Sequence, residues 1–237
     1  MENYNQQGYY QTPDVAFAAN VSKAMRSVYL KMFLALLVTA ATSFVVVLAQ
    51  QSFLIYMFQN QWVYWGLLIA EIVLVFSVSA RINKISTTTA NLLFYAYSIL
   101  NGIVLSVIFM IYTSGSIFQT FLITAGVFGA MSAYGYFTKS DLTKFGSFLT
   151  MALIGLVICI VVNMFLASST LDWIISFAGV AIFIGLTAWD TQKIKTMMAY
   201  SDGSNIGKIA TIGALSLYLD FINLFLYLLR FFGASRD

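Results

Sequence analysis

The stretch 216-SLYLDFINLFLYLL-229 places one acidic residue, Asp220, inside a run that is otherwise suited to lipid. A charged aspartate at the centre of a transmembrane helix costs about 3 kcal/mol on insertion scales. The residues that share its face at helical spacing are Ser216, Asn223, Tyr227 and Arg230. Because lipid cannot satisfy polar groups, we expect this polar stripe to face the interior of a helix bundle. Hydrogen bonding between helices would be a purely structural explanation of the stripe, and an ion path a functional one.

The composition of the whole chain is that of a membrane protein. Hydrophobic residues make up 60% of it and charged residues only 9%, whereas about a quarter of the residues in a soluble domain are charged. The chain contains no histidine, so any metal would be bound by oxygen, which favours a hard cation. The net charge of +3 is too small to indicate a nucleic-acid surface. The single cysteine, Cys159, lies in an apolar run and is expected to be buried.

Apolar windows long enough to cross a bilayer, which takes about 20 residues, recur along the chain. The seven windows are residues 28–50, 61–80, 90–112, 117–137, 146–167, 171–192 and 209–232. Residues 1–27 are polar and are expected to form a disordered tail ahead of a single membrane domain, residues 28–237. The sequence therefore predicts an all-α polytopic membrane protein with seven transmembrane helices in one bundle.

The basic residues predict the orientation of this bundle. Ten of the twelve Lys and Arg residues lie in the tail, at the edge of the first window, or in the connections after windows 2, 4 and 6. The connections on the other face contain none. Because cytoplasmic loops are enriched in Lys and Arg, the N-terminus is predicted to be cytoplasmic and the C-terminus to lie outside.

Small residues in the fourth window indicate where helices approach closely. The residues in question are Gly126, Gly129, Ala130, Ala133 and Gly135. Small side chains let two helix backbones come near each other, so we expect this face to be a helix–helix contact.

The candidate partner of Asp220 is Asp190, in the segment 185-GLTAWDTQKIK-195. If Trp173 and Trp189, the two tryptophans of the window 171–192, mark the two membrane interfaces, Asp190 lies at the cytoplasmic rim as an ordinary helix-end acid. If the helix instead continues past Lys193, whose long side chain can reach outward, Asp190 faces Asp220 inside the bundle.

A third acid, Glu71, lies in the middle of the second window, and Arg81 follows ten residues later. This spacing is about 15 Å of helix rise, so each of the two residues needs a partner from another helix. Intramembrane acids are typical of ion paths and proton relays.

Three segments resemble one known family. They are YGYFTKSDLTKFGSFLTMALIGLVICIVVNMFL, GLTAWDTQKIK and LSLYLDFINLFLYLLRFFG, and they resemble the Bax inhibitor family, most closely its bacterial branch, over about residues 25–233. The resemblance implies a seven-helix fold with the last helix near the centre. It also implies a calcium-permeable leak path governed by two hydrogen-bonded aspartates, Asp190 and Asp220, with Arg81 as a latch. Glu71 matches an acid of the family's second span.

The chemistry of two neighbouring carboxyl groups suits a proton-sensitive gate. Two carboxyl groups within hydrogen-bond reach titrate in separate steps. When protonated they share a proton, and when ionised they repel each other, approach Arg81 or bind calcium through oxygen. The predicted gate and calcium ligands are therefore Asp190 and Asp220, and the predicted ion path includes Glu71, Ser216 and Asn223.

Other functions are weighed against this prediction. A proton-coupled transporter would use the same acids but would also need a substrate pocket. A regulator that binds another membrane protein, such as a quality-control protease, is a further alternative. An intramembrane aspartyl protease is disfavoured because the Trp189–Asp190 and Leu219–Asp220 contexts do not match its motifs. We therefore expect no enzymatic activity and no resident cofactor, with the lipid bilayer, calcium ions and protons as partners. The expected location is the cytoplasmic (inner) membrane of a bacterium.

Overall fold

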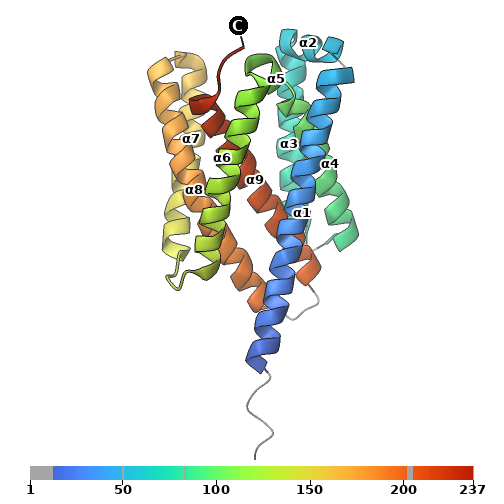
Figure 1. Ribbon diagram of the computed structural model, residues 1–237, viewed down its shortest axis with the longest axis vertical. Coiled ribbons are helices and arrows are strands. Elements are labelled where there is room, and N and C mark those ends of the chain that lie inside the picture. Colours follow the sequence, from blue (N-terminus) through green and yellow to red (C-terminus); the bar gives the residue numbers. More distant parts are fainter. Residues whose placement is uncertain (1–12, 50, 83, 202–204, 237) are drawn as a thin grey trace, which may run out of the picture.

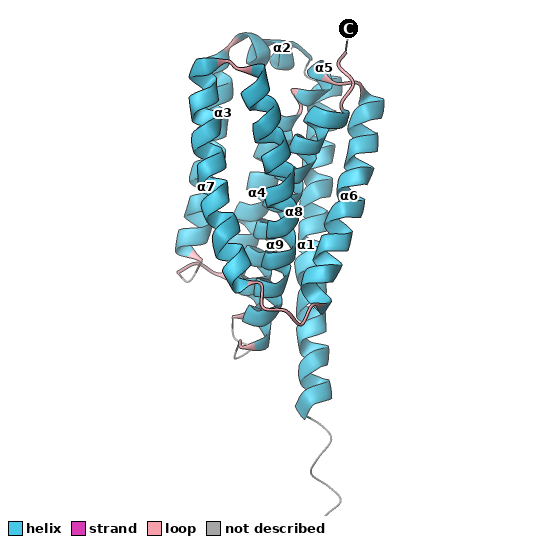
Figure 2. Ribbon diagram, turned by 90° about the vertical axis from the view of Figure 1, so that its left-hand side faces the viewer, coloured by secondary structure: helices cyan, strands magenta, loops and turns pink. Residues whose placement is uncertain are grey.

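The computed structural model describes residues 13–49, 51–82, 84–201 and 205–236 (Figure 1). The helices in this part of the chain are α1 (Pro13–Ala49), α2 (Gln51–Gln59), α3 (Gln61–Arg81), α4 (Thr87–Leu105), α5 (Ile108–Ile111), α6 (Ser114–Phe137), α7 (Thr143–Leu166), α8 (Ser169–Ala199) and α9 (Ile206–Phe232). The all-helical prediction is confirmed for the described residues (Figure 2).

Several helix boundaries differ from the predicted windows. Helix α1 already begins at Pro13, so residues 13–27, expected in the tail, are helical, while residues 1–12 lie outside the described part of the chain. The short helix α2 occupies the connection after the first window. The third window is divided into α4 and α5, which are separated at Ser106 and Val107. Helix α8 continues past Lys193 to Ala199, which is the second of the two interpretations of Asp190.

Hydroxyl residues at the connections explain where three helices begin. An N-cap side chain accepts a hydrogen bond from one of the backbone N–H groups that the first turn leaves without a partner. The caps are Ser86 on α4, Thr113 on α6 and Ser168 on α8. The polar connections between the apolar windows therefore set the first residue of the helix that follows.

The length and apolar character of the helices fit a bilayer. Within the described residues, six helices are long and apolar enough to cross a membrane: Asn20–Leu48, Thr87–Ile111, Ser114–Phe137, Thr143–Leu166, Ser169–Ala199 and Ile206–Phe232. Large apolar side chains on the outer faces are exposed, among them Phe33 and Phe44 on α1 and Phe148 and Phe165 on α7. Apolar residues thus face outward as well as inward, as lipid requires.

The core lies along α8 and α9. Helix α9 packs against α8, α1, α6 and α4, while α7 packs against α8, and α3 against α4 and α2. Figure 1 shows α9 running obliquely between α7 on one side and the α3–α4 pair on the other. Helix α1 begins at one end of the bundle and the described chain ends at the opposite one (Figures 1 and 2).

Two predictions about small residues are wrong. Of the three glycines predicted to make close helix contacts on α6, only Gly135 does so, against the backbone of Ala188 on α8. Gly126 and Gly129 have open space beside them. Cys159 is exposed rather than buried. Both errors have the same cause: composition shows that a helix face is small or apolar, but not whether lipid or another helix covers it.

Candidate functional site

The polar stripe of α9 faces α8. Ser216 lies beside the Asp190 carboxylate, and the ring of Tyr227 stacks on Phe183 of α8 with centroids 5.9 Å apart. At the far end, Arg230 Nη1 donates to Asp172 Oδ1 at 2.9 Å. A helix face that is polar over several turns therefore lies inside the bundle, where protein groups replace water.

Glycines allow these two helices to approach closely. A Cβ atom added to Gly179 of α8 would lie 2.7 Å from the Tyr227 ring, and one added to Gly213 of α9 would lie 2.9 Å from Ile194. Both distances are shorter than van der Waals contact, so larger residues would push α8 and α9 apart. Close packing keeps the polar groups between the helices away from bulk water.

Both predicted acids lie at this interface and are buried. Asp190 is 8% exposed and Asp220 is 5% exposed. Asp220 feels the charge of Asp190, and both acids feel the charge of Lys193. In the described part of the chain, Asp220 Oδ2 is a buried oxygen without a hydrogen-bond partner, and no hydrogen bond joins the two carboxyl groups directly. The α8–α9 interface thus contains two acids in a setting of low polarity with an acceptor still unused.

Lys193, the basic residue nearest to Asp190 in the sequence, is exposed. Lys193 lies about one helical turn beyond Asp190, and its Nζ atom lies 4.6 Å from the centroid of the Trp189 ring. The next lysine on α8, Lys195, donates from Nζ to the carbonyl of Tyr136 on α6 at 2.7 Å. Lys195 thus ties the end of α8 to α6, whereas Lys193 contacts its own helix and adds positive charge to the region of the two acids.

The structure does not bring Arg81 to these acids. Arg81 is exposed at the end of α3, and among the described residues its side chain forms no ion pair or hydrogen bond. Helix α3 packs on α4 and α2 rather than on the α8–α9 interface. Asn223 donates from Nδ2 to the carbonyl of Leu219 on its own helix at 2.8 Å.

Glu71 belongs to a separate polar centre on another side of α9. Asn101 of α4 donates from Nδ2 to Glu71 Oε1 at 2.9 Å, and Tyr218 Oη of α9 lies 2.9 Å from Asn101 Oδ1. Thr39 of α1 lies 2.6 Å from Tyr218 Oη and donates to the carbonyl of Ser98 at 2.9 Å. The sequence interpretation missed Asn101, Tyr218 and Thr39. An asparagine inside the window 90–112 was a usable signal for the first, whereas threonine and tyrosine are too common in membrane helices to stand out.

A half-buried lysine forms a third polar centre. Lys31 Nζ of α1 donates to Asn91 Oδ1 at 2.9 Å and to Thr211 Oγ1 at 2.8 Å, with the Gly207 carbonyl at 3.4 Å. The ammonium group thus has an oxygen for each of its three hydrogens. The three contacts join α1 to α4 and α9.

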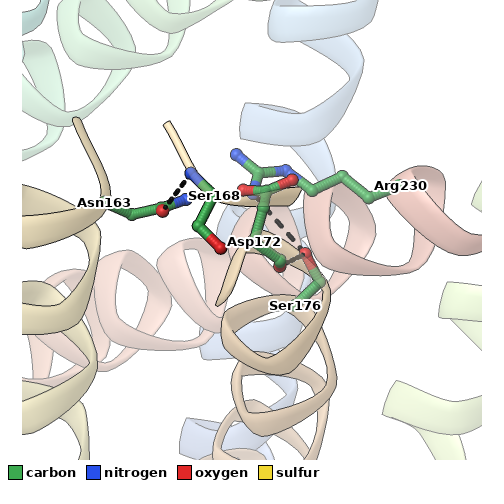
Figure 3. A network of polar contacts seen from close by, with 5 residues as sticks. All are labelled: Asn163, Ser168, Asp172, Ser176 and Arg230. Carbon is green, nitrogen blue, oxygen red and sulfur yellow. Dashed lines mark hydrogen bonds and ion pairs between the residues drawn. The ribbon is translucent and has the colours of Figure 1, made fainter. Parts of the chain in front are cut away.

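The end of the bundle where α9 terminates carries the network shown in Figure 3. Arg230 reaches Asp172 in the first turn of α8 and lies 3.5 Å from Ser176 Oγ. The side chain of Asn163 accepts from the backbone N–H of Ser168 at 3.0 Å, closing the connection between α7 and α8. The ion pair is well exposed, with side-chain exposures of 47% and 56%, so it is expected to contribute less than about 1 kcal/mol.

No group of three or more acidic or cysteine side chains in the described part of the chain is arranged to hold a metal ion. A calcium ion at Asp190 and Asp220 would therefore have two carboxylates and would need further oxygens from water or backbone. Such a sparse donor set suits a passing ion better than a permanently bound one.

Comparison with known proteins matches nearly the whole chain to one family. The model of the family described as "Inhibitor of apoptosis-promoting Bax1" matches residues 21–237. The chain is 48% identical over 223 residues to inner membrane protein YbhL of Escherichia coli strain K12, which covers 92% of this chain and 94% of that protein. It is 46% identical over 218 residues to a protein of Borreliella burgdorferi, with 91% and 94% covered. It is 43% identical over 224 residues to protein RP147 of Rickettsia prowazekii, with 93% of each covered.

Proposed function

Since the chain belongs to the Bax inhibitor family, we propose that this integral membrane protein is a pH-sensitive leak path for calcium or a similar cation. The gate is the carboxyl pair Asp190 and Asp220. The observation that carries the proposal is the burial of both acids between α8 and α9, with one oxygen of Asp220 lacking a partner among the described residues. Intramembrane acids of this kind are costly, and they generally serve ion or proton movement.

The gate works through the charge of the pair. With a shared proton, the two carboxyl groups bind each other and hold α8 against α9. Without it, two negative charges in a setting of low dielectric constant repel each other strongly, and a divalent cation can replace the proton between them. Ser216, beside Asp190, supplies a further oxygen, and Asn223 on the same face of α9 is assigned to the path. Glu71, which the sequence also placed on the path, is left out of it because it bonds to Asn101 in the separate centre on another side of α9.

Arg81 is proposed as a latch that reaches the pair only in another state of the protein. Helix α3 packs on α4 and α2, so Arg81 would approach the acids only after a movement of α3 relative to α9. In the state described here Lys193 supplies the positive charge felt by both acids.

The proposed placement has seven spans, with α3 as the seventh and α9 central. Helix α3 has 21 residues, which is about 31 Å of helix and enough to cross the hydrocarbon core. The N-terminus is assigned to the cytoplasm from the distribution of Lys and Arg. The Escherichia coli relative is named as an inner membrane protein, which supports the cytoplasmic membrane as the location.

The placement is tested by cysteine mapping in a Cys159→Ser background. Single cysteines at Thr138 and at Ser235 are treated in intact cells with a membrane-impermeant maleimide. Reaction at Ser235 alone is the expected result. Reaction only of the cysteine at position 138 would show that the orientation is the reverse of the one proposed. Reaction of both cysteines would place the two positions on the same side of the membrane, and the number of spans between them would then be even rather than three.

The function is tested with purified protein in liposomes that contain a calcium-sensitive dye. The wild type is expected to pass calcium at a rate that changes with pH near neutrality. The double variant Asp190→Asn, Asp220→Asn should lose the pH response, whereas Asp172→Asn, an acid outside the pair, should keep it. A full pH response in the double variant would refute the proposed gate. Calcium-independent proton movement coupled to another solute would favour the transporter, and absence of any flux would favour the regulator.

A further inference from the structure

Four helices meet at the hydrogen-bonded chain that starts at Glu71. In order, it runs from Glu71 of α3 to Asn101 of α4, Tyr218 of α9 and Thr39 of α1, and it ends at the carbonyl of Ser98. The four contacts measure 2.9, 2.9, 2.6 and 2.9 Å. All four side chains are buried, and Tyr218 is 0% exposed. Water therefore has little access to this chain and cannot readily supply a hydrogen to a contact between two oxygen atoms.

A count of hydrogens shows that an ionised Glu71 leaves this chain incomplete. Asn101 then donates to Glu71, and the single hydroxyl hydrogen of Tyr218 goes to Asn101. Thr39 has one hydroxyl hydrogen but two acceptors to serve, Tyr218 Oη and the Ser98 carbonyl. One of the four contacts is left without a hydrogen, between two oxygen atoms at close range.

A protonated Glu71 completes the chain if the amide of Asn101 is reversed. The carboxylic acid donates to Asn101 Oδ1, and Asn101 Nδ2 donates to Tyr218 Oη. Tyr218 then donates to Thr39, and Thr39 donates to the Ser98 carbonyl. Reversing an amide exchanges two groups of nearly equal shape, so this arrangement needs the same heavy-atom positions and one added proton.

Within the part of the chain that the structure describes, no positively charged side chain acts on Glu71 in place of that proton. The helices packed against α3 are α2 and α4, and neither contains Lys, Arg, Asp or Glu. The titratable groups that face Glu71 are the hydroxyls of Tyr97 on α4 and Tyr218 on α9. A carboxylate in an apolar site without a cation is expensive, and taking up a proton removes that cost.

We propose that Glu71 is a second proton-binding site, separate from Asp190 and Asp220, and that its proton sets the direction of the hydrogen bonds linking α3 and α4 to α9 and α1. Tyr218 and Asp220 are two residues apart on α9, which turns them about 200° from each other at nearly the same depth. The two acidic centres thus lie on opposite sides of one helix. Binding of a proton at Glu71 converts a carboxylate into a carboxylic acid and transfers nothing else.

The glutamate content of the chain allows this site to be observed selectively. The sequence contains two glutamates, Glu2 and Glu71. In a Glu2→Gln background, protein labelled with ¹³C at the glutamate carboxyl carbon has one labelled acid, and infrared spectroscopy separates its protonated form from its ionised form. We expect the carbonyl stretch of a carboxylic acid near neutral pH. We expect that band to vanish in Glu71→Gln and to shift in Asn101→Leu, which removes its acceptor.

Two comparisons decide whether the site is separate and whether the proton is present. The band should persist in the double variant Asp190→Asn, Asp220→Asn, and its loss there would refute the claim of a separate site. A labelled band typical of an ionised carboxylate near neutral pH would refute proton binding. If Glu71→Gln does not fold, the spectrum of the Glu2→Gln protein still decides the second point. Calcium flux does not enter these measurements, so the leak proposal and this one fail independently.

Discussion

Removing the hydroxyl group of Tyr218 should destabilise the bundle although the aromatic ring is retained. In Tyr218→Phe the ring keeps its edge-on contacts with Phe94 and Tyr97, at centroid distances of 5.7 and 5.8 Å. The hydroxyl contacts Thr39 at 2.6 Å and Asn101 at 2.9 Å, and the residue is fully buried. A buried group that loses its partner costs about 1–3 kcal/mol. Because both partners keep another contact, we expect a total loss of about 2 kcal/mol.

This loss is large enough to measure in detergent micelles. It corresponds to roughly a 30-fold change in the unfolding equilibrium and to a fall of roughly 4–8 °C in the thermal midpoint. Tyr97→Phe is the matched control, because Tyr97 is also buried but its hydroxyl makes no hydrogen bond within the described residues. The control should change stability by about 0.5 kcal/mol or less.

A double-mutant cycle isolates the contact between α1 and α9. Thr39→Val and Tyr218→Phe together should be less destabilising than the sum of the single changes, with a coupling of about 1 kcal/mol. Equal midpoints for Tyr218→Phe and Tyr97→Phe would refute the reasoning, because they would show that the buried hydroxyl is not part of a hydrogen-bonded chain. Additive effects of the two single changes would show that Thr39 and Tyr218 do not act on each other.

Three further predictions concern other parts of the bundle. Gly135→Ala should lower the thermal midpoint because its Cβ would meet a backbone carbonyl of α8, whereas Gly126→Ala, which has open space, should be neutral or stabilising by up to about 1 kcal/mol; equal effects would contradict the packing described. Arg230→Gln and Asp172→Asn should each change stability by less than about 1 kcal/mol, because their ion pair is exposed, and a larger loss in unfolding experiments would contradict this. Hydrogen bonds from Thr143 hold the pKa of Asp141 below its usual value. The contribution of Asp141 to stability is therefore fully present above the pKa of the unfolded state, and it is lost only as the pH falls through the lowered pKa of the folded state. Asp141→Asn should therefore leave the pH response of calcium flux near neutrality unchanged, and a flattened response would assign the sensor to this loop.

Local features of the chain predicted the helices well. The window 90–112 is divided between α4 and α5. Hydropathy and the polar connections located the other long helices to within a few residues, except that α1 begins earlier and α8 ends later than the windows 28–50 and 171–192. Both departures occur where a helix extends beyond the apolar run. Hydrogen bonding along the backbone does not stop where hydrophobicity stops, so a window chosen by apolar content underestimates such helices.

The candidate site was predictable only in part. Asp220 was recognisable because an acid in an apolar run is costly, and helical spacing correctly grouped it with Ser216 and Arg230 on the face that contacts α8. Arg81 illustrates the limit of this approach. A cation near an acid in a sequence pattern need not reach it in space, because its helix packs on α4 and α2 instead of α8. Asn101 was an unused signal of the same kind as Asp220.

The sequence by itself determined that this protein lies in a membrane, that it is helical, and which of its residues are too polar for lipid. These are local properties, set by the transfer free energy of each side chain and by the repeat of the α-helix. Only the tertiary structure decided which polar residues meet. Asp190 of α8 lies against the side of α9 that carries Asp220, whereas Glu71 is linked through Asn101 to Tyr218 on a different side of α9. Those meetings depend on how each helix is rotated and on which helix packs beside it, and residues far apart in the chain decide both.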